Sequence, residues 1–165
     1  MSSPRCRYVP DIPLPSYAYV PGRHPHPTRD PAGHSFGAPK PSFPPLDPER
    51  WATSRPYLYG IDLFNHGYYW EAHEVWEGLW RAHGRTETIA LFFKGLIALA
   101  AAGVKYRQGR PIGVQRHAER ARDCFGQVAQ QLDHRPEYLG LELDKLIRYA
   151  TALAQGTAPD QNPLA

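Results

Sequence analysis

Residues 64–84 read FNHGYYWEAHEVWEGLWRAHG, and this stretch carries most of what the sequence predicts about the fold. It holds three of the chain's four tryptophans, which fall on overlapping stripes if residues 68–83 form a helix. Gly67 is expected to end the preceding helix in a left-handed cap, and Gly84 to close the new one. Large aromatic rings at such spacing most often pack in a core. The segment therefore predicts a helix that packs within a helical domain.

Proline and glycine divide the rest of the domain into further helices. A short helix is expected at Asp47-Pro48, and longer ones are expected to begin at Pro56, at Thr86 or Thr88, and after Pro111 and Pro136. The segment Ile89–Tyr106 is apolar on nearly all sides, as is typical of a helix in the middle of a bundle. No segment alternates with a period of two. We therefore predict an all-α bundle of about five helices, arranged as antiparallel helical hairpins and preceded by a proline-rich extended arm.

Composition divides the chain into three parts. Of the 18 prolines, 13 fall within the first 48 residues, where they disfavour helix and favour extended or polyproline II backbone. Aromatic residues in the same stretch lead us to expect that part of it packs on the domain. We predict a proline-rich arm over residues 1–47, a helical bundle domain over 48–157 and a disordered tail over 158–165.

Charge and composition favour a soluble protein without a nucleic-acid partner. The formal net charge of +3 is mild, and the basic stretch 105–122 is explained by a helix C-terminus and a solvated face. Two distant cysteines suit a reducing compartment, and we find neither a signal peptide nor an uncharged run long enough to cross a membrane. The sequence also lacks a Gly-rich phosphate loop and a Ser/His/Asp nucleophile signature. We expect a cytoplasmic protein that has no membrane partner.

A histidine and two glutamates stand one helical turn apart in the tryptophan-rich segment. His73 and Glu77 are four positions apart and project from the same side of a helix, with Glu74 flanking them. The order resembles the zinc-protease pattern HExxH, except that Glu77 stands where the second histidine would be. A His/carboxylate pair favours a divalent metal ion of the harder kind, such as manganese or iron. A catalytic centre requires about three protein ligands, so a further ligand must come from elsewhere.

Four other histidines are candidates for that further ligand: His66 in the turn before the helix, and His24, His26 and His34 in the arm. Each candidate also has a purely structural explanation. His73 can be a buried histidine bonded to Glu77 or to a backbone carbonyl, and Glu77 can pair with Arg81 one turn on. Glu74 can be a solvated or capping acid, and the arm histidines can be exposed turn residues.

The chain resembles the family known as domain of unknown function 309, small helical proteins of bacteria and archaea. The resemblance is carried by the pattern from Leu63 to Trp80, which contains EAHExWExLW, and by Phe93-x-Gly95-Leu96-Ile97. It implies an all-helical bundle. It also implies the family's label of predicted metal-dependent hydrolase, whose polar motif falls on His73, Glu74 and Glu77.

Two functions from different classes follow as expectations. In the first, the protein is a metal-dependent hydrolase in which His73 and Glu77 bind the ion, His66, His26 or His34 completes the shell, and Glu74 acts as general base. Its ligand is then an unidentified small molecule or peptide. In the second, the protein is a non-catalytic interaction module that binds a peptide or forms a homo-oligomer, and the same residues only fix helix packing.

Overall fold

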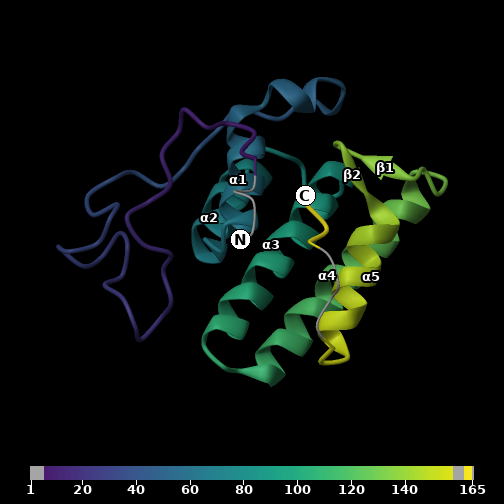
Figure 1. Ribbon diagram of the computed structural model, residues 1–165. Helices are drawn as coiled ribbons and strands as arrows, with labels where there is room; N and C mark the ends of the chain where they lie inside the picture. The colour runs from purple at the N-terminus through teal and green to yellow at the C-terminus, as the bar shows by residue number, and fades with distance from the viewer. Residues whose placement is uncertain (1–5, 158–161, 165) are drawn as a thin grey trace.

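Five α-helices, one 3-10 helix and one two-stranded hairpin make up the regular structure of the computed structural model, which describes residues 6–157 and 162–164 (Figure 1). In chain order they are η1 (Pro48–Thr53), α1 (Arg55–Asn65), α2 (Tyr69–Trp80), α3 (Thr88–Arg107), α4 (Pro111–Gln131), β1 (Glu137–Tyr138), β2 (Leu141–Glu142) and α5 (Leu143–Ala154). The predicted all-α bundle behind a proline-rich arm is confirmed.

Most helix boundaries fall where capping residues, prolines and glycines predicted them. The side chain of Asp47 caps η1, and that of Ser54 caps α1. Gly67 ends the first hairpin turn with φ +83°, a conformation that only glycine adopts readily. Helix α3 begins at Thr88, one of the two expected starts, but the residue at its cap position is Glu87, and the hydroxyl of Thr88 donates to the side chain of Gln131, 2.7 Å away on α4.

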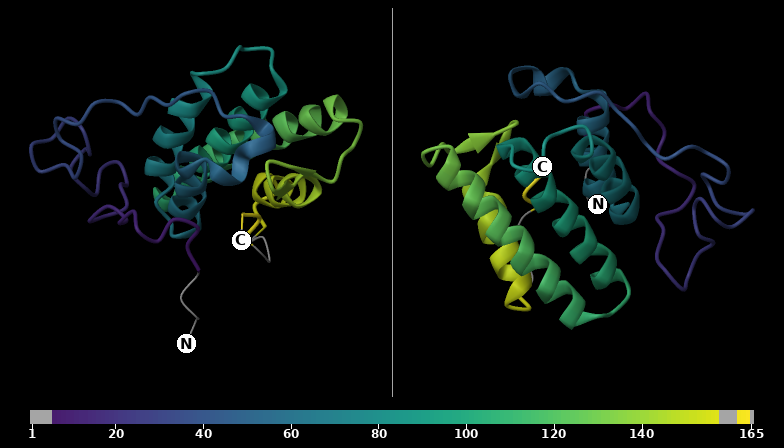
Figure 2. Two further views of the ribbon diagram at one scale, coloured as in Figure 1. Left: turned by 90° about the horizontal axis from the view of Figure 1, so that it is seen from above. Right: turned by 180° about the vertical axis from the view of Figure 1, so that it is seen from behind.

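Helix α3 lies in the middle of the bundle, between α2 and α4, while α5 packs on α4 and α1 packs on α2 (Figures 1 and 2). By length and composition alone α3 could cross a membrane, but 61% of its most apolar window is buried inside the fold. Gly95 is one reason for the close packing, because a Cβ there would lie 2.5 Å from the ring of Phe125 on α4. An apolar helix of this kind is a core helix.

The fifth α-helix begins later than the sequence predicts. We expected it directly after Pro136, but β1 and β2 come first and pair antiparallel across a turn at Leu139 and Gly140, both with positive φ. Tertiary contacts hold this turn. The hydroxyl of Tyr57 donates to the Leu139 carbonyl at 2.8 Å, and a Cβ on Gly140 would lie 2.3 Å from the ring of Trp51. These partners lie more than 80 positions away in the sequence, so a local pattern does not reveal the hairpin.

The arm has no helix or strand in its described part, residues 6–47, and runs along the side of α1 and α2 that faces away from α3 to α5 (Figure 1). Its backbone is fastened to two buried carboxylates. Asp62 on α1 accepts bonds from the N–H groups of Tyr8 and Val9, and Glu71 on α2 accepts one from Tyr19. The arm is therefore docked by specific polar contacts as well as by apolar side chains.

The predicted disordered tail 158–165 falls mostly outside the described residues, which include only 162–164 of it. For those three residues the structure differs from the prediction. The side chain of Leu164 is buried, and its carbonyl accepts a hydrogen bond of 3.0 Å from Asn65. Asn162 in turn donates to Asn65 at 2.8 Å. A buried asparagine side chain fixes this segment, because an amide buried without partners is costly.

Candidate functional site

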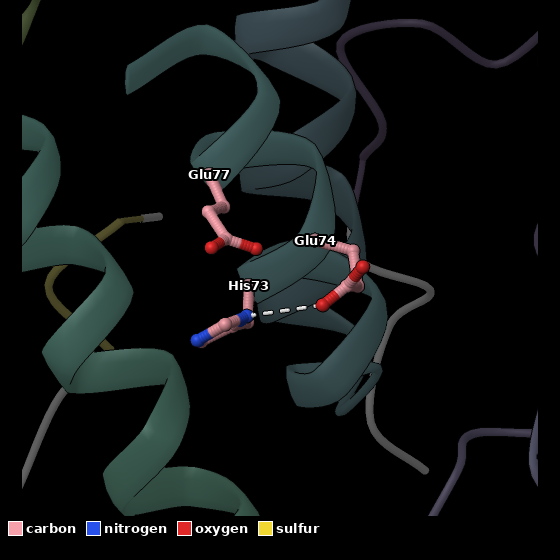
Figure 3. A group of neighbouring side chains, drawn as sticks. All are labelled: His73, Glu74 and Glu77. Atoms are coloured by element: carbon pink, nitrogen blue, oxygen red, sulfur yellow. Dashed lines mark ion pairs between the residues drawn. The ribbon is translucent and has the colours of Figure 1, made fainter. Parts of the chain in front are cut away.

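The polar group predicted on the tryptophan-rich helix is present on α2. His73, Glu74 and Glu77 each offer one ligand atom, and these atoms all lie within 4.8 Å of one another. Figure 3 shows the two carboxylates and the imidazole ring projecting from neighbouring turns of the helix. All three side chains are half-buried. The i, i+4 spacing of His73 and Glu77 therefore brings them together as expected.

The imidazole of His73 lacks a saturating partner. Its Nδ1 lies 3.5 Å from Oε1 of Glu74, too long for a good hydrogen bond, and this nitrogen is buried without any hydrogen-bond partner. The second ring nitrogen points away from Glu74 (Figure 3). The neighbouring His73 ring holds the pKa of the Glu74 carboxyl below its usual range. The charges of Lys40 and Arg81 make smaller contributions in the same direction.

Arg81 neutralises one of the two carboxylates. Its guanidinium lies 2.9 Å from Oε2 of Glu77, one helical turn before it, which is the ordinary pairing expected as an alternative to metal binding. Both side chains are about a third exposed, so solvent screens the pair and it contributes little to stability. An incoming cation would compete with Arg81 for Glu77.

Helix α4 contributes a second, half-buried histidine, His117. Burial lowers the pKa of His117, and the positive charges of Arg120, Lys105 and His73 lower it further. Sequence reasoning missed His117. Its position could have revealed it. His117 stands one residue before Ala118, which lies on the buried stripe of α4. A polar residue beside a core stripe is expected to lie at the edge of the contact with a neighbouring helix.

The other histidines proposed as ligands have different partners. The Nδ1–H of His66 donates to the Asp62 carbonyl at 2.8 Å, and the ring of His26 packs against Trp70 at a centroid distance of 5.5 Å. His34 lies 2.9 Å from Glu71. Within the described residues, the group of potential ligands on α2 has three members and includes none of these histidines.

Glu71 is a buried carboxylate that sequence reasoning did not single out. It is buried, and its Oε1 accepts from Nε2 of His34 at 2.9 Å, while Nδ1 of the same ring bonds to Ser35 at 2.8 Å. Tyr17 packs on the His34 ring with centroids 4.7 Å apart. His34, held by Ser35 and Tyr17, thus docks the arm on Glu71. The spacing in the sequence does predict a separate role for Glu71. It stands two positions before His73 and therefore lies on the opposite side of the helix.

The tryptophans of α2 mainly serve packing, as expected. Trp76 is fully buried and lies so close to α1 that a Cβ on Gly60 would be 2.2 Å from its Nε1. A groove of about 880 Å³ lies elsewhere, where the α3–α4 turn approaches the end of α5, and none of the three polar residues lines it. Tyr106 and Ile112, both strongly exposed, stand at that groove.

The fold and the site together define a class: helical-hairpin bundles with a histidine and two glutamates clustered on one inner helix. Residues 57–117, less than half of the chain, match the model of the family described as "Domain of unknown function (DUF309)". The match ends at His117, so it includes α2 and all of the polar group. A comparison with curated proteins found no match.

Proposed function

We propose that the protein is a metal-dependent hydrolase whose divalent ion is held by His73, Glu77 and Glu74. The observation that supports this most directly is the approach of three ligand atoms to within 4.8 Å, one of them on an imidazole whose buried Nδ1 has no hydrogen-bond partner. One nitrogen and two carboxylate oxygens suit manganese or iron better than a site of histidines or cysteines would. The donor set therefore fits a hard divalent cation.

In this proposal the chain itself supplies positioning and charge. When bound, the ion would supply a Lewis acid and a water made acidic enough to attack at neutral pH. His73 and Glu77 hold their positions because α2 packs through Trp76 into the core. Glu74 was expected to be a general base, but its ligand atom lies close to those of the other two groups, and we assign it as the third donor, the second of the two carboxylate oxygens. Three protein donors leave positions open for water and substrate.

Metal content and a matched pair of histidine variants test the proposal. We expect full-length protein purified without a His tag to carry about one Mn²⁺ or Fe²⁺ per chain after loading and desalting. His73→Asn should reduce this to less than about a tenth of an ion. His134→Asn is the control, because His134 is exposed and its φ of +56° is a conformation that asparagine accepts. Equal metal content in both variants would remove the metal site from consideration.

The second candidate function is the non-catalytic interaction module, which binds a peptide or a second copy of the chain. The pairing of Arg81 with Glu77 favours it, because a carboxylate that is already neutralised needs no ion. Under this proposal His73→Asn lowers the melting temperature while wild-type protein binds no metal. A metal stoichiometry near one would decide against it.

A further inference from the structure

Three side chains at the contact between the arm and α2 form a continuous series of hydrogen bonds. The hydroxyl of Ser35 lies 2.8 Å from Nδ1 of His34, and Nε2 of the same ring lies 2.9 Å from Oε1 of Glu71. The side chains of His34 and Glu71 are each only 6% exposed, whereas Ser35 is partly exposed. A hydroxyl beside an imidazole that a third group orients is the arrangement that activates a serine. Because His34 and Glu71 are 37 positions apart, no local motif reveals it.

The positions of the protons follow from what each atom can donate or accept. A carboxylate only accepts, and Oε1 of Glu71 also accepts the N–H of Tyr19 at 2.9 Å. The hydrogen between the ring and Glu71 therefore belongs to Nε2 of His34. In a neutral imidazole the other nitrogen is then an acceptor, so the hydroxyl of Ser35 donates to Nδ1. Ser-His-Asp hydrolases use the two ring nitrogens in the opposite sense, with the same transfer of a proton from serine to imidazole.

The second carboxylate oxygen of Glu71 favours that proton transfer. This atom, Oε2, is buried and has no hydrogen-bond partner among the described residues. A buried carboxylate that lacks partners is stabilised by a positive neighbour. Glu71 therefore stabilises the imidazolium that forms when His34 takes the proton of Ser35.

The loop that carries Ser35 is tightly closed and has open space beside it. The N–H of Ser35 donates to the Pro27 carbonyl at 3.0 Å across the loop. A Cβ on Gly33 would lie 2.3 Å from the carbonyl oxygen of His26, so the two sides of the loop are in close contact. At Gly37, in contrast, a Cβ would meet nothing within 4 Å. A small molecule can therefore approach the loop without displacing it.

We propose that Ser35 is a nucleophile for acyl transfer from a carboxylic ester, with His34 as general base and Glu71 as the residue that positions the ring. None of the three belongs to the polar group of the metal proposal, so this is a separate activity. The Oγ of Ser35 attacks the ester carbonyl carbon while its proton passes to Nδ1 of His34. Collapse of the tetrahedral intermediate breaks the bond to the alkoxide, which takes that proton and leaves as an alcohol. Water then repeats both steps, releases the carboxylic acid and restores the hydroxyl.

Covalent labelling of the full-length protein tests whether Ser35 is activated. A fluorophosphonate reacts with activated serines, and peptide mass spectrometry locates the label. We expect Ser35 to react at least about a hundredfold faster than Ser16, an exposed serine of the same arm, because general-base assistance contributes about 10²–10⁴-fold. Equal labelling of the two serines would overturn the proposal. Glu71→Gln should slow labelling about tenfold or more while trypsin cleavage of the arm stays at the wild-type rate. Labelling at the wild-type rate would remove Glu71 from the mechanism.

Ester hydrolysis separates this activity from the metal site. With p-nitrophenyl acetate we expect a burst of about one p-nitrophenolate per chain, which EDTA leaves unchanged. Ser35→Ala should abolish the burst, and Ser16→Ala is the matched control that should retain it. A burst that EDTA removes, or that Ser35→Ala retains, would overturn the proposal and leave the metal-dependent function standing. A burst in protein that binds no metal would instead contradict the metal-dependent function alone.

A thiol in place of the hydroxyl gives a test that leaves the arm docked. Replacing His34 would also remove its bond to Glu71, whereas Ser35→Cys keeps that bond. In this variant the new thiol should react with iodoacetamide at neutral pH at least about tenfold faster than Cys6, an exposed cysteine of the same chain, because the imidazole takes its proton. A rate equal to or below that of Cys6 would show that His34 docks the arm without acting as a base.

Discussion

Replacing Asp62 by alanine should release the start of the arm from the helical domain. The Asp62 side chain is 0% exposed, and its two oxygens accept the N–H groups of Tyr8 at 2.8 Å and Val9 at 3.0 Å. Arg7 stands 3.6 Å away with its Nε, an atom buried without a hydrogen-bond partner. One carboxylate therefore satisfies two backbone donors and also lies beside the positive charge of Arg7.

The magnitude follows from these contacts. A hydrogen bond to a charged partner contributes about 1.5–3 kcal/mol, so the two backbone bonds to Asp62 together hold the arm by about 3–6 kcal/mol. The arm has no helix or strand of its own in its described part, and it can open while the bundle stays folded. Its freed N–H groups then regain water. We therefore expect the loss to appear mainly in arm opening, with a smaller drop in the free energy of global unfolding.

Hydrogen exchange and limited proteolysis measure that opening directly. For Asp62→Ala we expect exchange at the amides of Tyr8 and Val9 to accelerate by at least about a hundredfold, because every 1.4 kcal/mol is a factor of ten. Trypsin cleavage after Arg23 should accelerate as well. Asp11→Asn is the matched control, since Asp11 lies on the same arm but pairs with Arg55 in solvent. Changes of less than threefold in the Asp62 variant would refute the argument that this carboxylate holds the arm.

Two further substitutions test the packing of α1. Gly60→Ala should destabilise the protein by about 1–3 kcal/mol, because the new Cβ would lie 2.2 Å from Nε1 of Trp76. Denaturant unfolding followed by tryptophan fluorescence measures this loss. The control is Gly126→Ala, which should be neutral or stabilising because nothing lies within 4 Å of the new Cβ. Tyr57→Phe should cost about 1 kcal/mol at neutral pH by leaving the Leu139 carbonyl unpaired. Burial raises the pKa of Tyr57 well above 10, so above pH 10 this residue ionises in the unfolded chain first and the wild type loses stability. The free energy of unfolding of the phenylalanine variant should therefore fall less steeply with pH above 10 than that of the wild type. Equal slopes would contradict this.

How much of the fold the sequence predicts depends on how local the determining contacts are. Gly67 and Pro111 mark helix boundaries through their own backbone preferences, so these boundaries could be placed without a structure. The two-residue strands β1 and β2 are too short to show a period. Their turn depends on Trp51 and Tyr57, two residues that a local pattern at 137–142 does not contain.

The candidate site was also predictable only as far as local contacts determine it. His73 and Glu77 share one helix face, and the period of the helix brings them together. The electrostatic effects of His73 on His117 and of Lys40 on Glu74 depend on how α4 and the arm pack against α2, which no spacing within residues 64–84 encodes. We predicted that an arm histidine completes the site, but His34 instead contacts Glu71 on α2 and is not in the group. That prediction did not resolve which side of α2 the arm occupies.

Helix geometry separates the two polar clusters of α2, and this separation is testable. At 100° per residue, His73 and Glu77 lie about 40° apart around the axis, whereas Glu71 lies about 200° from His73. The imidazole of His34, bonded to Glu71, therefore holds the arm on one side, while His73, Glu74 and Glu77 form a group on the other. We expect His34→Asn to increase trypsin cleavage of the arm and to leave Mn²⁺ binding unchanged, and His73→Asn to do the reverse. If His34→Asn also abolished Mn²⁺ binding, the two clusters would have to be treated as one site, and the assignment of three ligands to α2 alone would be wrong.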